Sequence, residues 1–477
     1  MSISVAKNTA FMTFASIGQK IISFVYFTIV ARSIGVAGTG KYFFALSFTT
    51  IFVVFVDLGL TNVLVRESAK VKEKIQKYFS SVLVAKVVLG IISYIALIVV
   101  INAMDYESET KYLVYISGIT MLTDSIHLSV YGILRAIGNL KYEAVGIVLS
   151  QLATLILGTI FIVFKFPLVY LMVAFAIPSF LNVIYASTIL YKKYGVKLSP
   201  RYDREILKYI IPIAIPFALA AIFSRVYSYI DSILLSKLAG DHAVGLYSVP
   251  YKIAYAFQFI PFALAAALYP RFSECFVHDK KRLSFLFERG IKYLLIVSLP
   301  IVVGINVLSY DIVVTFFTKS YIDSILPLQI LMIGVVFAYL NIAIGSLLNA
   351  CSRQGTQTTF VGIVMVINII MNVLLIPKFG VVGAAISACV GNIILTILSC
   401  FVVPRITAIS VPFILKTIIQ LVVASGVMGI VAWFINREMN FVFAVVGGGL
   451  VYVGMLFITR TITKEQIGEA LRLLKSS

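Results

Sequence analysis

Long apolar runs follow one another along nearly the whole chain, and this feature constrains the fold more than any other. A run of about 20 apolar residues is long enough to cross the hydrocarbon core of a bilayer as a helix. Because backbone groups in lipid must be hydrogen-bonded within the protein, the runs predict an all-α integral membrane fold. They predict about fourteen transmembrane helices, over residues 8–31, 42–60, 78–102, 112–134, 143–164, 168–190, 209–235, 244–269, 293–317, 325–350, 359–376, 381–403, 413–435 and 441–459.

The composition supports this interpretation and excludes other classes of protein. Hydrophobic residues make up 61% of the 477 residues and charged residues 12%, whereas charged residues make up about 25% of an average soluble domain. The same apolar content excludes a disordered chain. The four cysteines and three histidines show neither metal-ligand nor disulfide spacing, so we expect no metal or other cofactor.

The net charge of +19 lies mostly in short segments between the apolar runs, as in residues 66–74. This pattern indicates cytoplasmic loops beside anionic lipid, and it argues against a nucleic-acid partner. With a cytoplasmic amino terminus, about 27 basic residues fall inside and about 8 outside. Both termini are therefore predicted to be cytoplasmic, in a multi-pass protein of the cell membrane.

The two halves of the chain show an internal repeat at an offset of 205 residues. Lys20 aligns with Arg225, Gly35 with Gly240, and Gly40 with Gly245. Six helices in each half predict two parallel six-helix repeats around a central cavity, with helices thirteen and fourteen appended. The predicted organisation is an N-lobe at 1–190, a cytoplasmic basic linker at 191–208, a C-lobe at 209–403, and two helices with a cytoplasmic basic tail at 404–477. The basic connections 191–208 and 271–292 are expected to lie at the membrane surface as amphipathic segments.

Residues 35–42 match most of a phosphate-binding GxxxxGK loop but do not fit its context. Tyr42 stands where a Ser or Thr would hold magnesium, no strand precedes the motif, and the predicted topology places it outside the cell. We therefore interpret it as a turn between the first two helices.

Four basic residues lie deep inside the predicted spans, where one charge costs about 3 kcal/mol. Lys20 and Arg225 are the deepest and occupy equivalent repeat positions, whereas Lys86 and Lys252 lie about eight residues into their helices. One interpretation is that long side chains snorkel to the headgroups, which fits Lys86 and Lys252 better. The other is a positively lined, water-filled cavity that receives an anion.

Acidic residues are fewer at depth in the predicted spans. Asp57, Asp124 and Asp231 are candidate counter-ions for these bases, or candidate proton or sodium coupling sites. The counter-ion interpretation is favoured for Asp57 and Asp231, because bases lie in the same stretches.

Several motifs together resemble a known family. Residues 42–48, 57–60 and 66–67 resemble the opening of polysaccharide-transporter proteins, and the run from Arg225 through Asp231 to residues 245–247 resembles their seventh and eighth helices. The most specific motif runs from Asn368 and Asn372 to residue 385. These proteins belong to the multidrug/oligosaccharidyl-lipid/polysaccharide exporter superfamily.

The resemblance implies a flippase, not an enzyme, that moves polyprenyl phosphate- or pyrophosphate-linked oligosaccharides outward by alternating access. It assigns the phosphate-binding role to Lys20, Arg225 and Lys252, with Lys86 as a further candidate. The implied partners are the lipid-linked oligosaccharide, membrane lipid and glycan assembly enzymes.

Two alternatives stay open. A cation- or proton-coupled drug or metabolite antiporter of the same superfamily would need an acidic cavity, whereas the deep charges here are mostly basic. A membrane-embedded glycan transferase or ligase would normally carry catalytic carboxylates on a sizeable outside loop, and the predicted outside loops are nearly bare.

Overall fold

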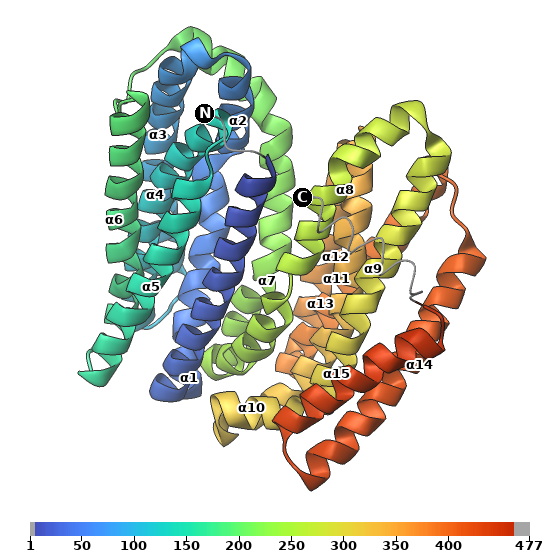
Figure 1. The fold of residues 1–477 in the computed structure, drawn as a ribbon. Helices are drawn as coiled ribbons and strands as arrows, with labels where there is room; N and C mark the ends of the chain where they lie inside the picture. The colour runs from blue at the N-terminus through green and yellow to red at the C-terminus, as the bar shows by residue number, and fades with distance from the viewer. Residues whose placement is uncertain (1–4, 462–477) are drawn as a thin grey trace. The chain divides into compact units, whose positions relative to one another are not determined.

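The computed structural model describes residues 5–461, and this part of the chain is helical with no strand (Figure 1). The α-helices are α1 (Val5–Asp57), α2 (Leu60–Lys70), α3 (Ile75–Ala103), α4 (Ser108–Ile137), α5 (Lys141–Val163), α6 (Val169–Tyr194), α7 (Arg204–Ala256), α8 (Phe259–His278), α9 (Lys280–Val307), α10 (Ser309–Phe317), α11 (Ile325–Ala350), α12 (Gln354–Phe379), α13 (Val381–Cys400), α14 (Val411–Glu438) and α15 (Phe441–Ile458). Three short 3-10 helices lie at Lys72–Lys74, Lys319–Ser324 and Val403–Arg405.

The described residues contain 12 spans that are long and apolar enough to cross a membrane. The two longest, Phe11–Asp57 with 47 residues and Arg204–His278 with 75, greatly exceed the roughly 20 residues that one crossing needs. Each is interrupted by one glycine with non-helical backbone angles, Gly35 or Gly240, which divides it into two segments that are each long enough for one crossing. Division of two of the 12 spans gives fourteen crossing helices, which confirms the all-α membrane fold that the sequence predicts.

The two glycines that divide these spans have nearly the same backbone conformation. Gly35 has φ 71° and ψ 179°, and Gly240 has φ 83° and ψ 177°. This region is accessible to glycine almost alone, because a Cβ atom would clash with the backbone. The two positions lie 205 residues apart, so the sharp break falls at the same place in each predicted repeat. The rest of the GxxxxGK segment is helical, so a single residue makes the turn expected there.

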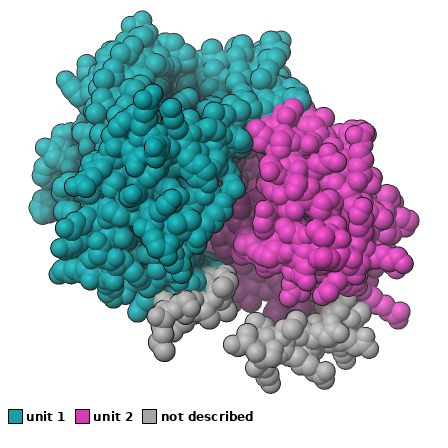
Figure 2. Space-filling view, turned by 90° about the horizontal axis from the view of Figure 1, so that it is seen from above, with its two compact units in different colours: residues 1–248, 361–384 teal, residues 249–360, 385–477 magenta. Residues whose placement is uncertain are grey.

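The chain forms two compact units, drawn in different colours in Figure 2: residues 1–248 with 361–384, and residues 249–360 with 385–477. In the first unit, α4 packs against α6, α3 and α2, and α5 packs against α1 and α6. A buried core that includes Leu64, Phe79, Val130, Leu134 and Ile210 joins α2, α3, α4 and the start of α7. The units follow packing rather than repeats, so the predicted lobe boundaries at 190 and 209 stay a prediction.

In the second unit, α9 packs against α11 and α14, and α14 packs against α15. The connection predicted at 271–292 belongs to α8 and α9, which are separated only by Asp279, and its position at the membrane surface stays a prediction. Asp279 begins α9 by accepting a hydrogen bond from the backbone N–H of Arg282 (2.9 Å). The span predicted at 293–317 is also divided, into α9 and the short α10. The end of the predicted basic tail, with Lys464, Arg472 and Lys475, lies outside the described residues.

Candidate substrate and coupling sites

Lys86 on α3 is buried and fully paired, which bears directly on its candidacy as a phosphate ligand. Its ammonium lies 2.6 Å from Asp57 Oδ1 at the end of α1. It also donates to Thr61 Oγ1 (2.7 Å) and to the Ser125 carbonyl oxygen (3.2 Å). An ammonium has three donors, and here all three have acceptors. The Lys86 side chain is only 1% exposed, so it does not snorkel to the surface.

Lys20 on α1 and Arg225 on α7 are in a different state from Lys86. Both side chains are exposed, in the middle of long helices. Within residues 5–461, neither takes part in an ion pair or hydrogen bond. Both belong to the first unit, whereas Lys252 is partly buried in the second unit. An unpaired cation at membrane depth is costly unless it faces water or an anion, so these two bases have free capacity for a ligand.

Asp231 on α7 is buried and hydrogen-bonded to neutral groups. Asn372 on α12 donates to its carboxylate at 2.6 Å, and the Tyr247 hydroxyl donates at 3.1 Å. Asn372 also donates to the Asn368 side chain (3.1 Å). Among the described residues Asp231 forms no ion pair, and in particular none with Arg225. A buried carboxylate beside side-chain amides is a geometry that can bind a small cation or a proton.

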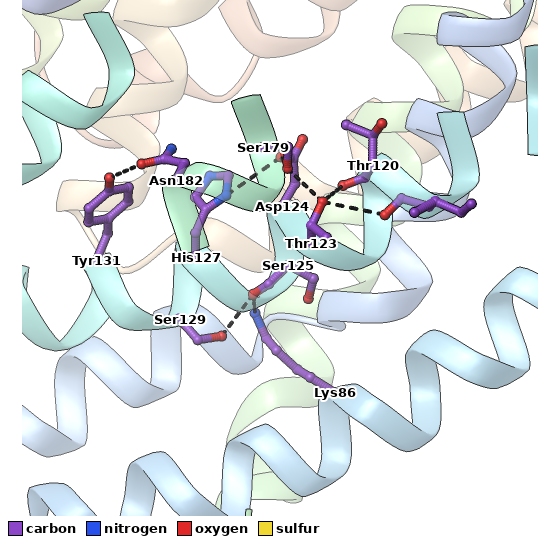
Figure 3. A network of polar contacts seen from close by, with 11 residues as sticks. Lys86, Thr120, Thr123, Asp124, Ser125, His127, Ser129, Tyr131, Ser179 and Asn182 are labelled. Carbon is purple, nitrogen blue, oxygen red and sulfur yellow. Dashed lines mark hydrogen bonds and ion pairs between the residues drawn. The ribbon is translucent and has the colours of Figure 1, made fainter. Parts of the chain in front are cut away.

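Asp124 on α4 lies in a polar cluster that connects α4 with α6 (Figure 3). Its carboxylate accepts a hydrogen bond from Ser179 Oγ (2.5 Å) and lies 3.5 Å from His127 Nδ1. Neither His127 nor Ser179 is among the site residues that the sequence predicts. The i,i+3 spacing of Asp124 and His127 indicates that the two side chains share one helix face. No sequence pattern indicates that Ser179 on α6 lies beside them.

A second polar group joins α2 to the start of α7. The Glu67 carboxylate accepts hydrogen bonds from Lys70 (2.9 Å) and from the Tyr209 hydroxyl (3.0 Å). Burial by itself raises the pKa of the Glu67 carboxyl, but these two hydrogen bonds and the charges of Lys70 and Arg66 outweigh it and hold the pKa below its usual range. The Glu67 carboxylate is therefore charged at neutral pH, and its hydrogen bond with Tyr209 connects α2 with α7.

Lys41, the basic residue of the GxxxxGK segment, is likewise engaged within the protein. Its ammonium lies 2.6 Å from Glu107 and 2.9 Å from Glu109. Lys41 also lines a cavity of about 430 Å³ together with Ser33 and Lys165. The segment is thus held by acidic side chains near the start of α4, which agrees with its interpretation as a structural turn.

Comparison with known proteins places the chain in a family. The model of the polysaccharide biosynthesis protein family matches residues 5–276, which is more than half of the chain. The chain belongs to this family. The MatE family model also matches, over residues 216–374, which agrees with membership of the wider exporter superfamily.

Relatives of this family member are membrane proteins and transporters. An uncharacterized membrane protein of Methanocaldococcus jannaschii is 24% identical over 464 residues, covering 92% of this chain and 91% of the relative. A probable low-salt glycan biosynthesis flippase of Haloferax volcanii is 21% identical over 417 residues, covering 83% of each chain. Among solved structures, a lipid II flippase in an inward closed conformation has a TM-score of 0.79 at 20% identity, covering 94% of this chain and 98% of that one.

These comparisons confirm the family that the sequence motifs indicated. They also support a multi-pass transporter of the cell membrane rather than an enzyme. The similarity to the lipid II flippase structure concerns the fold, since the identity is low.

Proposed function

We propose that this family member is a flippase that moves a lipid-linked oligosaccharide from the cytoplasmic to the outer leaflet, with the lipid phosphates held by Lys20 and Arg225. The observation that carries the proposal is the contrast between the deep bases. Lys86 has all three donors occupied, whereas Lys20 and Arg225 are exposed and have no partner within residues 5–461. A cation that stays unpaired in a membrane protein is suited to bind an anion that arrives from outside.

The physical demands of the task fit this arrangement. A glycan head group cannot cross hydrocarbon alone, because its hydroxyl groups would lose their hydrogen bonds to water. A polar pathway between the lobes would shield the head group while the polyprenyl tail stays in lipid. An inside-negative potential favours outward movement of an anion by about 2.3 kcal/mol per charge per 100 mV, so the phosphate charge itself supplies driving force.

Further residues complete the proposed cycle. Lys252 is the third candidate for the phosphates, and the buried Asp231 with Asn372 is a candidate site for a coupling ion. Alternating access of two six-helix lobes would expose the phosphate site to each leaflet in turn. Glycan assembly enzymes are the proposed protein partners, because they would supply the substrate at the cytoplasmic leaflet.

The proposal predicts that loss of both free bases abolishes flipping. Purified protein would be reconstituted in liposomes with a labelled polyprenyl-pyrophosphoryl oligosaccharide, and exposure of the label to an impermeant sugar-modifying reagent would be followed. We expect protein-dependent exposure in the wild type and at least a tenfold lower rate in Lys20→Ala/Arg225→Ala, since two charge-assisted contacts are each worth about 1.5–3 kcal/mol. Lys20→Arg should retain activity because it keeps the charge.

A matched control separates the phosphate site from general charge. Lys319→Ala/Lys378→Ala removes the same two charges from exposed positions and should flip at the wild-type rate. Flipping that survives in Lys20→Ala/Arg225→Ala would reject the anion site. No flipping by the wild type with several glycans and an imposed potential would reject the flippase and favour the antiporter.

A further inference from the structure

The polar cluster around Asp124 has a carboxylate with no fixed cation beside it. Ser179 donates to the Asp124 carboxylate at 2.5 Å, and the hydroxyl oxygens of Ser179 and Thr123 lie 2.6 Å apart. Among the described residues the only basic side chain within ion-pair distance of Asp124 is His127, at 3.5 Å. Asp124 occupies the middle of the Ser108–Ile137 span, where a lone charge is costly, and its side chain is 42% exposed.

His127 likewise has a buried ring nitrogen that lacks a hydrogen-bond partner. Its side chain is 13% exposed, and its Nδ1 atom is buried without a hydrogen-bond partner. The ring packs edge-on against Tyr131 at 5.6 Å between centroids. The Tyr131 hydroxyl is already used, because it donates to Asn182 Oδ1 on α6 at 2.5 Å. The Asp124 carboxylate lies 3.5 Å from this imidazole nitrogen.

Within the described residues, other charges on α4 and on the helices packed against it include two ion pairs and the unpaired Lys20 on α1. Lys86 on α3 is paired with Asp57 on α1, and Arg135 at the end of α4 forms a bidentate ion pair with Glu143 on α5. From α2, Thr61 contributes a neutral hydroxyl to Lys86, while Glu67 is engaged by Lys70. From α6, the groups that face the cluster are the neutral Ser179 and Asn182 (Figure 3).

The charge of the polar cluster itself therefore depends on its two ionisable groups, Asp124 and His127. With a charged carboxylate and a neutral imidazole, the cluster carries one net negative charge within the membrane. One added proton makes it neutral, and the cluster can hold that proton either on an imidazolium whose Nδ1–H donates to the carboxylate or on a carboxylic acid that donates to Nδ1.

We propose that Asp124 and His127 form a proton-binding site that holds one shared proton, and that release of this proton is coupled to transport. Ser179 and Thr123 are positioning residues, since they act through the Asp124 carboxylate. Proton binding stands independently of the substrate, whereas the coupling step rests on the proposed flippase function.

Spectroscopy on the purified protein in lipid tests the proton directly. At pH 7, infrared absorption of a carboxylic acid C=O group would report a proton on Asp124, and nitrogen NMR of an imidazolium would report a proton on His127. We expect one of these two signals in the wild type. If it is the carboxyl band, Asp124→Asn should remove it; if it is the imidazolium signal, His127→Gln should remove it. The exposed Asp323 serves as control, because Asp323→Asn should leave both spectra unchanged. An ionised carboxylate beside a neutral imidazole at pH 7 would overturn the proposal.

The coupling step is tested by flipping rates with and without a pH gradient across the liposome. We expect the flipping rates with and without the pH gradient to differ at least threefold in the wild type. The two rates should be equal in Asp124→Asn, which gives a ratio of 1. A ratio unchanged in Asp124→Asn would overturn the coupling. Absence of flipping under all conditions would count against the flippase, whereas the spectroscopic result would still decide the proton site.

Discussion

Substitution of Gly40 or Gly245 by alanine should destabilise the protein by about 3 kcal/mol or more, because each added Cβ would enter the backbone of the other helix. A Cβ on Gly40 would lie 1.8 Å from the carbonyl oxygen of Asp241, and one on Gly245 would lie 2.0 Å from that of Val36. Overpacking usually costs about 1–3 kcal/mol, and here no flexible side chain can move away. Thermal unfolding in detergent or lipid would measure the loss.

The reciprocity of this contact sharpens the test. Positions 36 and 40 are equivalent to 241 and 245 at the 205-residue offset. The segment around Gly40 in α1 therefore contacts the segment around Gly245 in α7 reciprocally, as two segments related by a two-fold axis would. Gly40→Ala and Gly245→Ala should therefore have similar effects. Gly426→Ala on α14 is the control, because a Cβ there meets nothing within 4 Å and should be neutral or stabilise the helix by up to about 1 kcal/mol. Wild-type stability of Gly40→Ala would contradict the close contact.

Removal of Asp57 from the Lys86–Asp57 ion pair should cost about 3–5 kcal/mol, because the Lys86 charge is then left buried and unpaired, and removal of Lys86 should cost less, because the Asp57 side chain is 28% exposed. Lys86→Met leaves the Asp57 carboxylate without its cation, and Asp57→Asn leaves an ammonium that is 1% exposed without its anion. The double variant Asp57→Asn/Lys86→Met removes both charges and should recover most of the stability. Thermal unfolding of the three variants gives the coupling energy as a double-mutant cycle.

The same variants test whether Lys86 binds substrate. We expect Asp57→Asn/Lys86→Met to flip lipid-linked glycan at a rate close to the wild type, because the Lys86 donors are occupied within the protein. Glu107→Gln, at an exposed ion pair with Lys41, should leave the unfolding midpoint nearly unchanged. A stable double variant that cannot flip would show that Lys86 contacts the phosphates after all.

The positions of the crossing helices could be predicted from the sequence. Hydropathy located the crossing helices, since burial in lipid selects apolar residues over a fixed length. It did not locate the helix ends in residues 271–292, where a polar stretch continues as helix beyond the predicted spans. A polar sequence at the end of an apolar run can still be helical, because backbone hydrogen bonding does not depend on side-chain polarity.

The pairing of side chains in the candidate sites could not be predicted from the sequence. The sequence by itself determined the membrane class, the number of helices, the family motifs and which ionisable residues lie at depth, because these depend on the order of residues along one chain. Only the tertiary structure decided that Lys86 is neutralised by Asp57 and that Asp124 meets Ser179. The same holds for the exposed state of Lys20 and Arg225. Such pairings depend on how each helix is rotated and how far it is shifted against its neighbours, and packing between helices fixes both.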